Sequence, residues 1–178
     1  MKDELNEEMK TQIDDLVSEI LTTFGYDVQS GGYVNIVGLV NFMGFTIGET
    51  NKLKPSEDGF ISISKDKADV VIGVNEDRSF EEKRFISAHE LGHYFLHYKD
   101  QSLSETVMHR EHRKGKDAKE NETDFFAACL LMPYETFKSK MHTLNQLGLP
   151  KQVVVKSLQH IFKVPEESIV RRIAEIEK

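Results

Sequence analysis

The sequence has little cysteine, no long apolar run and no surplus of basic residues. Its single cysteine, Cys129, cannot form a disulfide within the chain, which is the usage expected in a reducing cytosol. The apolar run "FFAACLLM" falls far short of the ~20 residues that a membrane-spanning helix needs. No cationic start leads into an apolar segment, so the sequence shows no secretory signal. We therefore expect a cytoplasmic protein that does not insert into a membrane.

The charge balance of the chain is acidic. Lys and Arg together number 23 against 30 Asp and Glu, which gives a net charge of -7. Non-specific binding to nucleic acid needs many basic side chains that displace counterions from phosphates, so direct DNA binding over a broad surface is not expected. With 178 residues, 39% of them hydrophobic, the chain can build a core as one domain or as one domain plus a small appendage.

The spacing of apolar residues predicts a mainly helical chain with strands in its first half. "GFISIS" and "VVIGV", separated by the polar turn "KDKAD", favour two strands, and a third is expected just after Gly44. The polar segment from Lys99 to Lys116 predicts a mobile loop. Helices are expected at residues 1–24, 35–43, 79–98, 117–132 and 134–147, and as two short helices on either side of Pro165. These elements indicate the α+β class with a small antiparallel sheet.

The stretch "AHELGHYFLH" contains a His-Glu-x-x-His pattern inside one of the expected helices. His89 and His93 are four residues apart, so both imidazoles lie on one helix face and can reach a single metal ion. Glu90 is rotated ~100° from His89, and it can approach the attacking water as a general base without binding the metal. A shuffled chain of this composition would show the pattern roughly 3% of the time, so the motif alone does not decide the function.

A catalytic zinc site needs a third protein ligand, and carboxylates of the next helix are the candidates. Glu120 and Asp124 are four residues apart and share a face, whereas Glu122 is rotated ~200° from Glu120 and should point away. We therefore assign Glu120 as the metal ligand. Asp124 is expected to accept the N–H of a ligand histidine and so to hold its tautomer. The alternative is that all three are solvated acids of a first helical turn.

Other potential ligands have simpler interpretations. His97 lies ~12 Å along the helix from His89, too far for one ion to bind both, so a structural or supporting role is expected. Cys129 is rotated ~180° from Glu120 and is expected to pack in the core. His109, Arg110 and His112 fall in the polar loop. One of these three could stabilise an oxyanion, but a solvated loop is the default interpretation.

The tail from Gly148 onward has the outline of a helix-turn-helix. It contains six basic and four acidic residues, a balance too slight to predict DNA binding. We interpret residues 148–178 as a docking or packing extension, with contact to DNA as the open alternative. The remainder, residues 1–147, is expected to form the main domain.

Two motifs in order resemble the ImmA/IrrE family of metallo-endopeptidases. "AHELGHYFLH" is followed by "ENETDFFAACLLMP", where the family has the form E-x-x-A-N/D-x-F-A-A-x-L-L-M-P. The matching residues are Glu120, Asp124, Phe126, Ala127, Ala128, Leu130, Leu131, Met132 and Pro133. Thr123 replaces the usual alanine and Cys129 a common glutamate, and neither change affects an expected ligand. The resemblance is strong from about Asp58 to Pro133 and weaker on both sides.

This resemblance implies a zincin-like fold with a gluzincin-type site. His89, His93 and Glu120 would bind the metal and Glu90 would act as the base. Zn²⁺ is the expected metal, with Mn²⁺ or Fe²⁺ as alternatives. Family members of mobile elements cleave a helix-turn-helix repressor, so such a repressor is the expected substrate and partner. The strand "ADVVIGV" is expected to offer an edge to an extended peptide.

Three other functions stay open. The protein could bind its cognate repressor and displace it without cleavage, or it could act as a toxin component beside that repressor. It could also be a DNA-binding module whose tail contacts DNA and whose metal is structural. A structural zinc is less favoured, because only three ligands are in evidence and Glu90 would have no structural reason to lie there.

Overall fold

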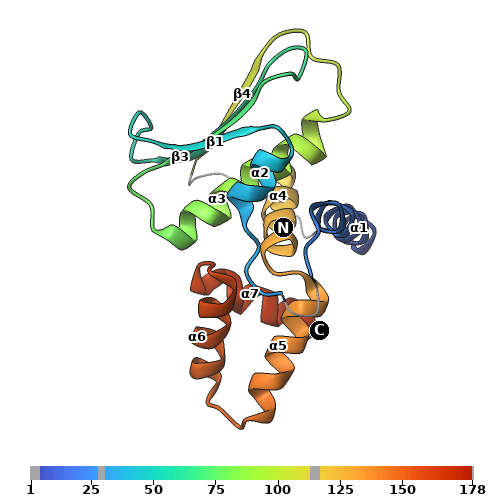
Figure 1. Cartoon of the computed structure of the whole chain (residues 1–178), viewed down its shortest axis with the longest axis vertical. Coiled ribbons are helices and arrows are strands. Elements are labelled where there is room, and N and C mark those ends of the chain that lie inside the picture. The colour runs from blue at the N-terminus through green and yellow to red at the C-terminus, as the bar shows by residue number, and fades with distance from the viewer. Residues whose placement is uncertain (1–4, 28–30, 113–116, 178) are drawn as a thin grey trace.

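The structure is a computed structural model that describes residues 5–27, 31–112 and 117–177. A small sheet lies at one end of the molecule, α5–α7 lie at the other, and α3 and α4 lie between them (Figure 1). The elements are α1 (Glu7–Phe24), α2 (Ile36–Phe42), β1 (Thr46–Thr50), β2 (Glu57–Ile63), β3 (Val70–Asn75), α3 (Phe80–His93), the π-helical turn η1 (Tyr94–Tyr98), β4 (Val107–His112), α4 (Ala118–Leu131), α5 (Tyr134–Gln146), α6 (Lys151–Phe162) and α7 (Glu166–Ile176). The predicted α+β class is confirmed.

The sheet has the strand order β1-β3-β2-β4 and is mixed. β2 pairs antiparallel with both β3 and β4, whereas β1 pairs parallel with β3. The sheet was expected to be antiparallel, and this expectation is wrong for the β1–β3 pair, which is parallel. The two strands run in the same direction because the chain reverses once between β1 and β2 and again between β2 and β3.

Two expectations about strands were wrong. Residues 107–112, predicted to be loop, form β4, because their backbone finds hydrogen-bonding partners along β2 that no local pattern signals. β3, the strand of "ADVVIGV", is paired on both sides and cannot accept a further strand. β4 pairs only with β2 among the described residues, so the open edge on that side of the sheet belongs to β4.

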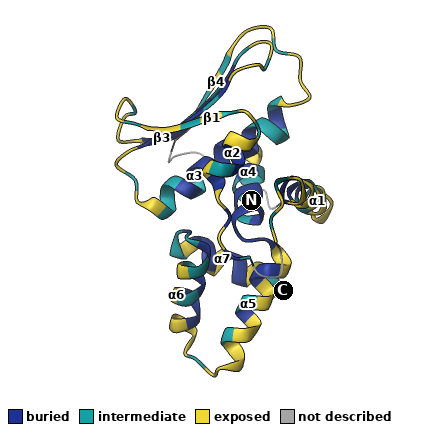
Figure 2. Ribbon diagram, viewed as in Figure 1, coloured by how far each residue is buried: buried dark blue, intermediate teal, exposed yellow. Residues whose placement is uncertain are grey.

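Helix α3 begins at a capping box. The side chain of Ser79 accepts from the backbone N–H of Glu82, and the carboxylate of Glu82 accepts from the backbone N–H of Ser79. Beyond the first turns nearly every residue of α3 is buried, because the helix packs against β2 and β3 on one side and against α4 on the other (Figure 2). A helix buried all round carries the site in the interior of the fold.

The tail forms the two expected short helices, α6 and α7, and packs against the rest of the chain. Arg84 of α3 is 3% exposed, and its Nε donates to the carbonyl of Lys163 at 2.9 Å, just past the end of α6. Its guanidinium also lies 4.2 Å from the centre of the Tyr33 ring. The guanidinium of Arg84 therefore hydrogen-bonds to a carbonyl at the C-terminal end of α6 and joins the tail to α3.

Within the described part of the chain, no helix is both long enough and apolar enough to cross a membrane.

Candidate metal centre

Helices α3 and α4 approach each other closely where the site forms. A Cβ atom added to Gly92 would lie 3.0 Å from Cδ1 of Phe126 on α4. Glycine at position 92 thus lets the two helices pack face to face, and packing is the reason for the glycine in the middle of the motif. The contact brings His89 and His93 of α3 opposite Glu120 of α4.

The ligand atoms of His89, His93 and Glu120 converge, all lying within 4.8 Å of one another. Nε2 of His89 is 3.1 Å from Nε2 of His93 and 3.1 Å from Oε2 of Glu120, and Nε2 of His93 is 3.5 Å from Oε1 of Glu120. Ligands at about 2.0–2.1 Å around a tetrahedral zinc are separated by roughly 3.3–3.4 Å. The spacing and chemistry of these three groups therefore fit one such ion.

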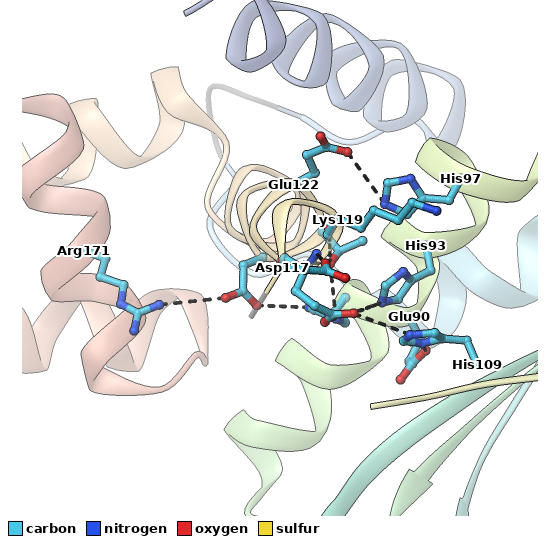
Figure 3. A network of polar contacts seen from close by, with 12 residues as sticks. Glu90, His93, His97, His109, Asp117, Lys119, Glu122 and Arg171 are labelled. Carbon is cyan, nitrogen blue, oxygen red and sulfur yellow. Dashed lines mark hydrogen bonds and ion pairs between the residues drawn. The ribbon is translucent and has the colours of Figure 1, made fainter. Parts of the chain in front are cut away.

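The ring of His89 is held on its other side by α4. Nδ1 of His89 lies 3.0 Å from Oδ1 of Asp124, so an N–H at Nδ1 leaves the lone pair on Nε2 toward His93 and Glu120. The hydroxyl of Thr123 also lies 3.2 Å from Nε2 of His89, while it donates to the carbonyls of its own helix. Asp124 itself lies 4.0 Å from Nη1 of Arg171, which reaches it from α7 (Figure 3).

Glu90 is completely buried beside the two histidines, beneath β2. A Cβ atom added to Gly59 of β2 would lie 3.3 Å from Oε1 of Glu90 and 2.6 Å from Cγ2 of Ile86. Any larger residue at position 59 would have to displace α3 or the sheet. Glycine at this strand position therefore makes room for the carboxylate of Glu90.

Burial controls the protonation of the site. The pKa of His93 is lowered from 6.5 to about 3, first by burial and then by the neighbouring His89 and His109. His93 is therefore a neutral imidazole near pH 7, the form that offers a lone pair to a metal. The pKa of the Tyr98 phenol is raised, first by burial and then by the charges of Glu90 and Glu120, which places this tyrosine in the electrostatic field of the same site.

His97 and Cys129 lie outside the convergent group. His97 is 8% exposed, and its Nε2 lies 3.8 Å from Oε2 of Glu122, away from the three ligand atoms. Burial lowers the pKa of His97, partly opposed by Glu122. Cys129 is 1% exposed and packs in the core. The positions of the His97, Glu122 and Cys129 side chains agree with the helical rotation from which they were predicted.

His109 is the site residue that the sequence could not single out, because it was one of three candidates in a segment whose default interpretation was a solvated loop. It lies on β4 opposite Ile61 of β2, whose side chain faces the core, and neighbouring residues of paired strands share a face. Its Nε2 is 3.5 Å from Oε1 of Glu120, and its Nδ1 is 4.0 Å from Oε2 of Glu90. The only signal was the short alternation "VMH", which is too weak to predict a strand. Arg110 and His112 also fall in β4, but their side chains lie outside the described residues.

Among solved structures, a Mycobacterium tuberculosis transcriptional regulator matches with a TM-score of 0.58 at 17% sequence identity. The match covers 92% of this chain and 46% of that chain, so this chain spans about half the length of that protein and shares its fold. The comparison with curated proteins gave no match. The model of the IrrE N-terminal-like domain, Peptidase_M78, matches residues 52–174. That match spans more than half of the sequence and includes both helices of the site, and the chain therefore belongs to the M78 metallopeptidase family.

Proposed function

We propose that this protein is a zinc-dependent endopeptidase whose site consists of His89, His93, Glu120 and Glu90. The convergence of two imidazole nitrogens and one carboxylate at 3.1–3.5 Å, with a completely buried glutamate beside them, carries the proposal. Two imidazoles and a carboxylate are ligand types that zinc takes in catalytic sites, and their spacing matches that of ligands around one ion. Residues 1–147 are proposed to form the peptidase domain, with residues 148–178 as an extension packed on it.

Each side chain has a part in peptide hydrolysis. A zinc ion held by the two histidines and Glu120 would polarise the scissile carbonyl and lower the pKa of water. Glu90 takes a proton at its carboxylate and later delivers it to the leaving amine. Asp124 holds the ring of His89 by accepting the N–H at Nδ1, which keeps Nε2 available as a ligand.

The proposed substrate is a helix-turn-helix repressor. The resemblance to the ImmA/IrrE family supports this substrate, and the description of the structural neighbour as a transcriptional regulator agrees with a role in control of transcription. The acidic net charge argues for a protein rather than a nucleic acid as the partner. The second candidate is a metal-binding regulator or toxin component that binds its repressor without cutting it.

Metal content tests the site itself. Wild type, Glu120→Ala and Glu122→Ala should be purified in parallel and their zinc measured by elemental analysis. About one zinc per chain is expected in the wild type and in Glu122→Ala, because Glu122 faces His97 instead of the ligand group. Glu120→Ala should lose most of its zinc. Equal zinc in all three proteins would exclude Glu120 as a ligand.

Cleavage tests the reaction. Candidate helix-turn-helix repressors should be incubated with wild type and with Glu90→Gln, and the products measured by intact mass. The wild type should produce two fragments, whereas Glu90→Gln should retain zinc and leave the repressor whole. An intact repressor that still forms a complex with the wild type would favour the binding-only regulator. Cleavage by Glu90→Gln would show that Glu90 is not the base.

A further inference from the structure

His109 spans two carboxylates of the site with its imidazole ring. One ring nitrogen faces Glu120 at 3.5 Å and the other faces Glu90 at 4.0 Å. The ring also lies against that of His93, with their centres 4.0 Å apart. Figure 3 shows His109 next to Glu90, entering from the strand side, while His93 enters from α3 and His97 from η1. His109 therefore borders the proposed ligands and the proposed base together.

The geometry separates His109 from the proposed ligands. In the described part of the chain, two groups of convergent ligand atoms occur, one of His89, His93 and Glu120 and the other of Glu90, His93 and His109. His109 groups with His93 and Glu90 and not with His89, so it does not belong to the group formed by His89, His93 and Glu120. It thus lies on the side of the site where Glu90 is found.

His109 also differs from a histidine with a purely structural role. His97 is 8% exposed and faces the single carboxylate of Glu122, at the edge of the network. The side chain of His109 is 27% exposed, on the strand whose outer edge has no strand partner among the described residues. It is therefore both in contact with the site and open to an incoming group.

We propose that His109 is a further catalytic residue, which donates a hydrogen bond to the oxygen of a carbonyl-like group that enters beside Glu90. This inference rests on the proposed peptidase function. In peptide hydrolysis negative charge develops on the carbonyl oxygen as water adds to the carbon, and a fixed N–H donor stabilises that charge. Loss of one such donor typically lowers kcat by about 10²–10³-fold. His109 contacts both Glu90 and Glu120 from the sheet side of the site.

Binding of acetohydroxamate tests this role without proteolysis. This small ligand offers carbonyl-type oxygens to zinc sites, and calorimetry can measure its affinity for zinc-loaded wild type, His109→Leu and His109→Gln. We expect about tenfold weaker binding to His109→Leu, the size of one lost hydrogen bond, and partial recovery in His109→Gln, which keeps an N–H donor. The exposed His142→Gln is the matched control and should bind as the wild type does.

Zinc content and affinity measured by chelator competition complete the test. His109→Leu should keep its zinc with an affinity within about threefold of the wild type, because His109 is not in the group of His89, His93 and Glu120. Lost zinc in His109→Leu would make His109 a ligand and overturn the inference. Retained zinc with unchanged acetohydroxamate binding would overturn the inference alone. A wild type that takes up no zinc would overturn the proposed function along with it.

Discussion

Ionisable side chains pack together at two faces of helix α4, and the two sets differ in how their atoms are arranged. Toward α3, Glu120 and Asp124 meet histidines whose lone pairs converge on one point. Toward α1 and α7, the thiol of Cys129 meets Asp14, and Arg172 lies over the ring of Phe125.

On the second face, the buried cation of Arg172 is paired with an acid of its own helix. Nη1 of Arg172 donates to Oε2 of Glu175 at 3.1 Å, and Arg172 is only 3% exposed. Burial raises the pKa of the Cys129 thiol well above its usual value, so the sulfur stays protonated and donates to Asp14. This cluster therefore holds a cation and an anion in contact, although Nε and Nη2 of Arg172 have no hydrogen-bond partner among the described residues.

The first face brings potential metal ligands together. Nε2 of His89, Nε2 of His93 and the carboxylate of Glu120 converge on one point, which is the arrangement expected of a site that holds a cation. The contrast shows that burial of polar residues does not by itself indicate function. What distinguishes a candidate site is the convergence of several ligand atoms on one point, and the following predictions test that distinction from the largest expected effect to the smallest.

The metal-free protein should lose stability as the pH falls from about 6.5 toward 3. Because the pKa of His93 is lowered to about 3 in the folded state, the unfolded chain binds this proton first and unfolding becomes easier in acid. The slope should be about 1.4 kcal/mol per pH unit, or about 5 kcal/mol over the range. Urea unfolding in EDTA measures it, and His93→Leu should remove most of this slope. An equal slope in both proteins would contradict the pKa shift.

Replacement of Arg172 by Leu should destabilise the protein by about 1.5–3 kcal/mol, since it removes the charge-assisted hydrogen bond from this 3% exposed guanidinium to Glu175. Zinc content should not change, because the cluster is on the other face of α4. The neighbouring Arg171→Leu is the control, and its 65% exposed side chain should make a difference of only about 0.5 kcal/mol. Loss of zinc in Arg172→Leu would show that the two faces are coupled.

Replacement of Asp124 by Ala should weaken zinc binding by about 10–100-fold, or about 1.4–2.7 kcal/mol, because His89 loses the acceptor that orients its ring. Chelator competition measures the affinity. Glu122→Ala, two residues away on the same helix, should stay within about threefold of the wild type. If both variants bind zinc equally well, Asp124 has no orienting role.

Replacement of Thr123 by Ala should change zinc affinity by less than about threefold. Its hydroxyl lies near His89 but also donates to the carbonyls of Lys119 or Glu120, so α4 already satisfies it. The same chelator competition applies. A loss of more than tenfold would instead make the hydroxyl part of the metal centre.

Sequence analysis predicted side-chain placement correctly where the placement depends on a single helix. The four-residue spacing of His89 and His93, and of Glu120 and Asp124, placed each pair on one face, and the structure brings the two faces together. It failed for β4, because a strand depends on a partner distant in the sequence. His109 could not be separated from Arg110 and His112 for the same reason, since its neighbours Glu90 and Glu120 lie on other elements.

The sequence by itself determined the helices, their capping residues and the order of the two site motifs, because these follow from contacts three and four residues apart. Only the tertiary structure decided the distance between α3 and α4, which depends on Gly92 packing against Phe126. It also decided the pairing of β4 with β2, which brings His109 to Glu90. Those contacts join segments far apart in the chain, and their energies come from packing that no local pattern specifies.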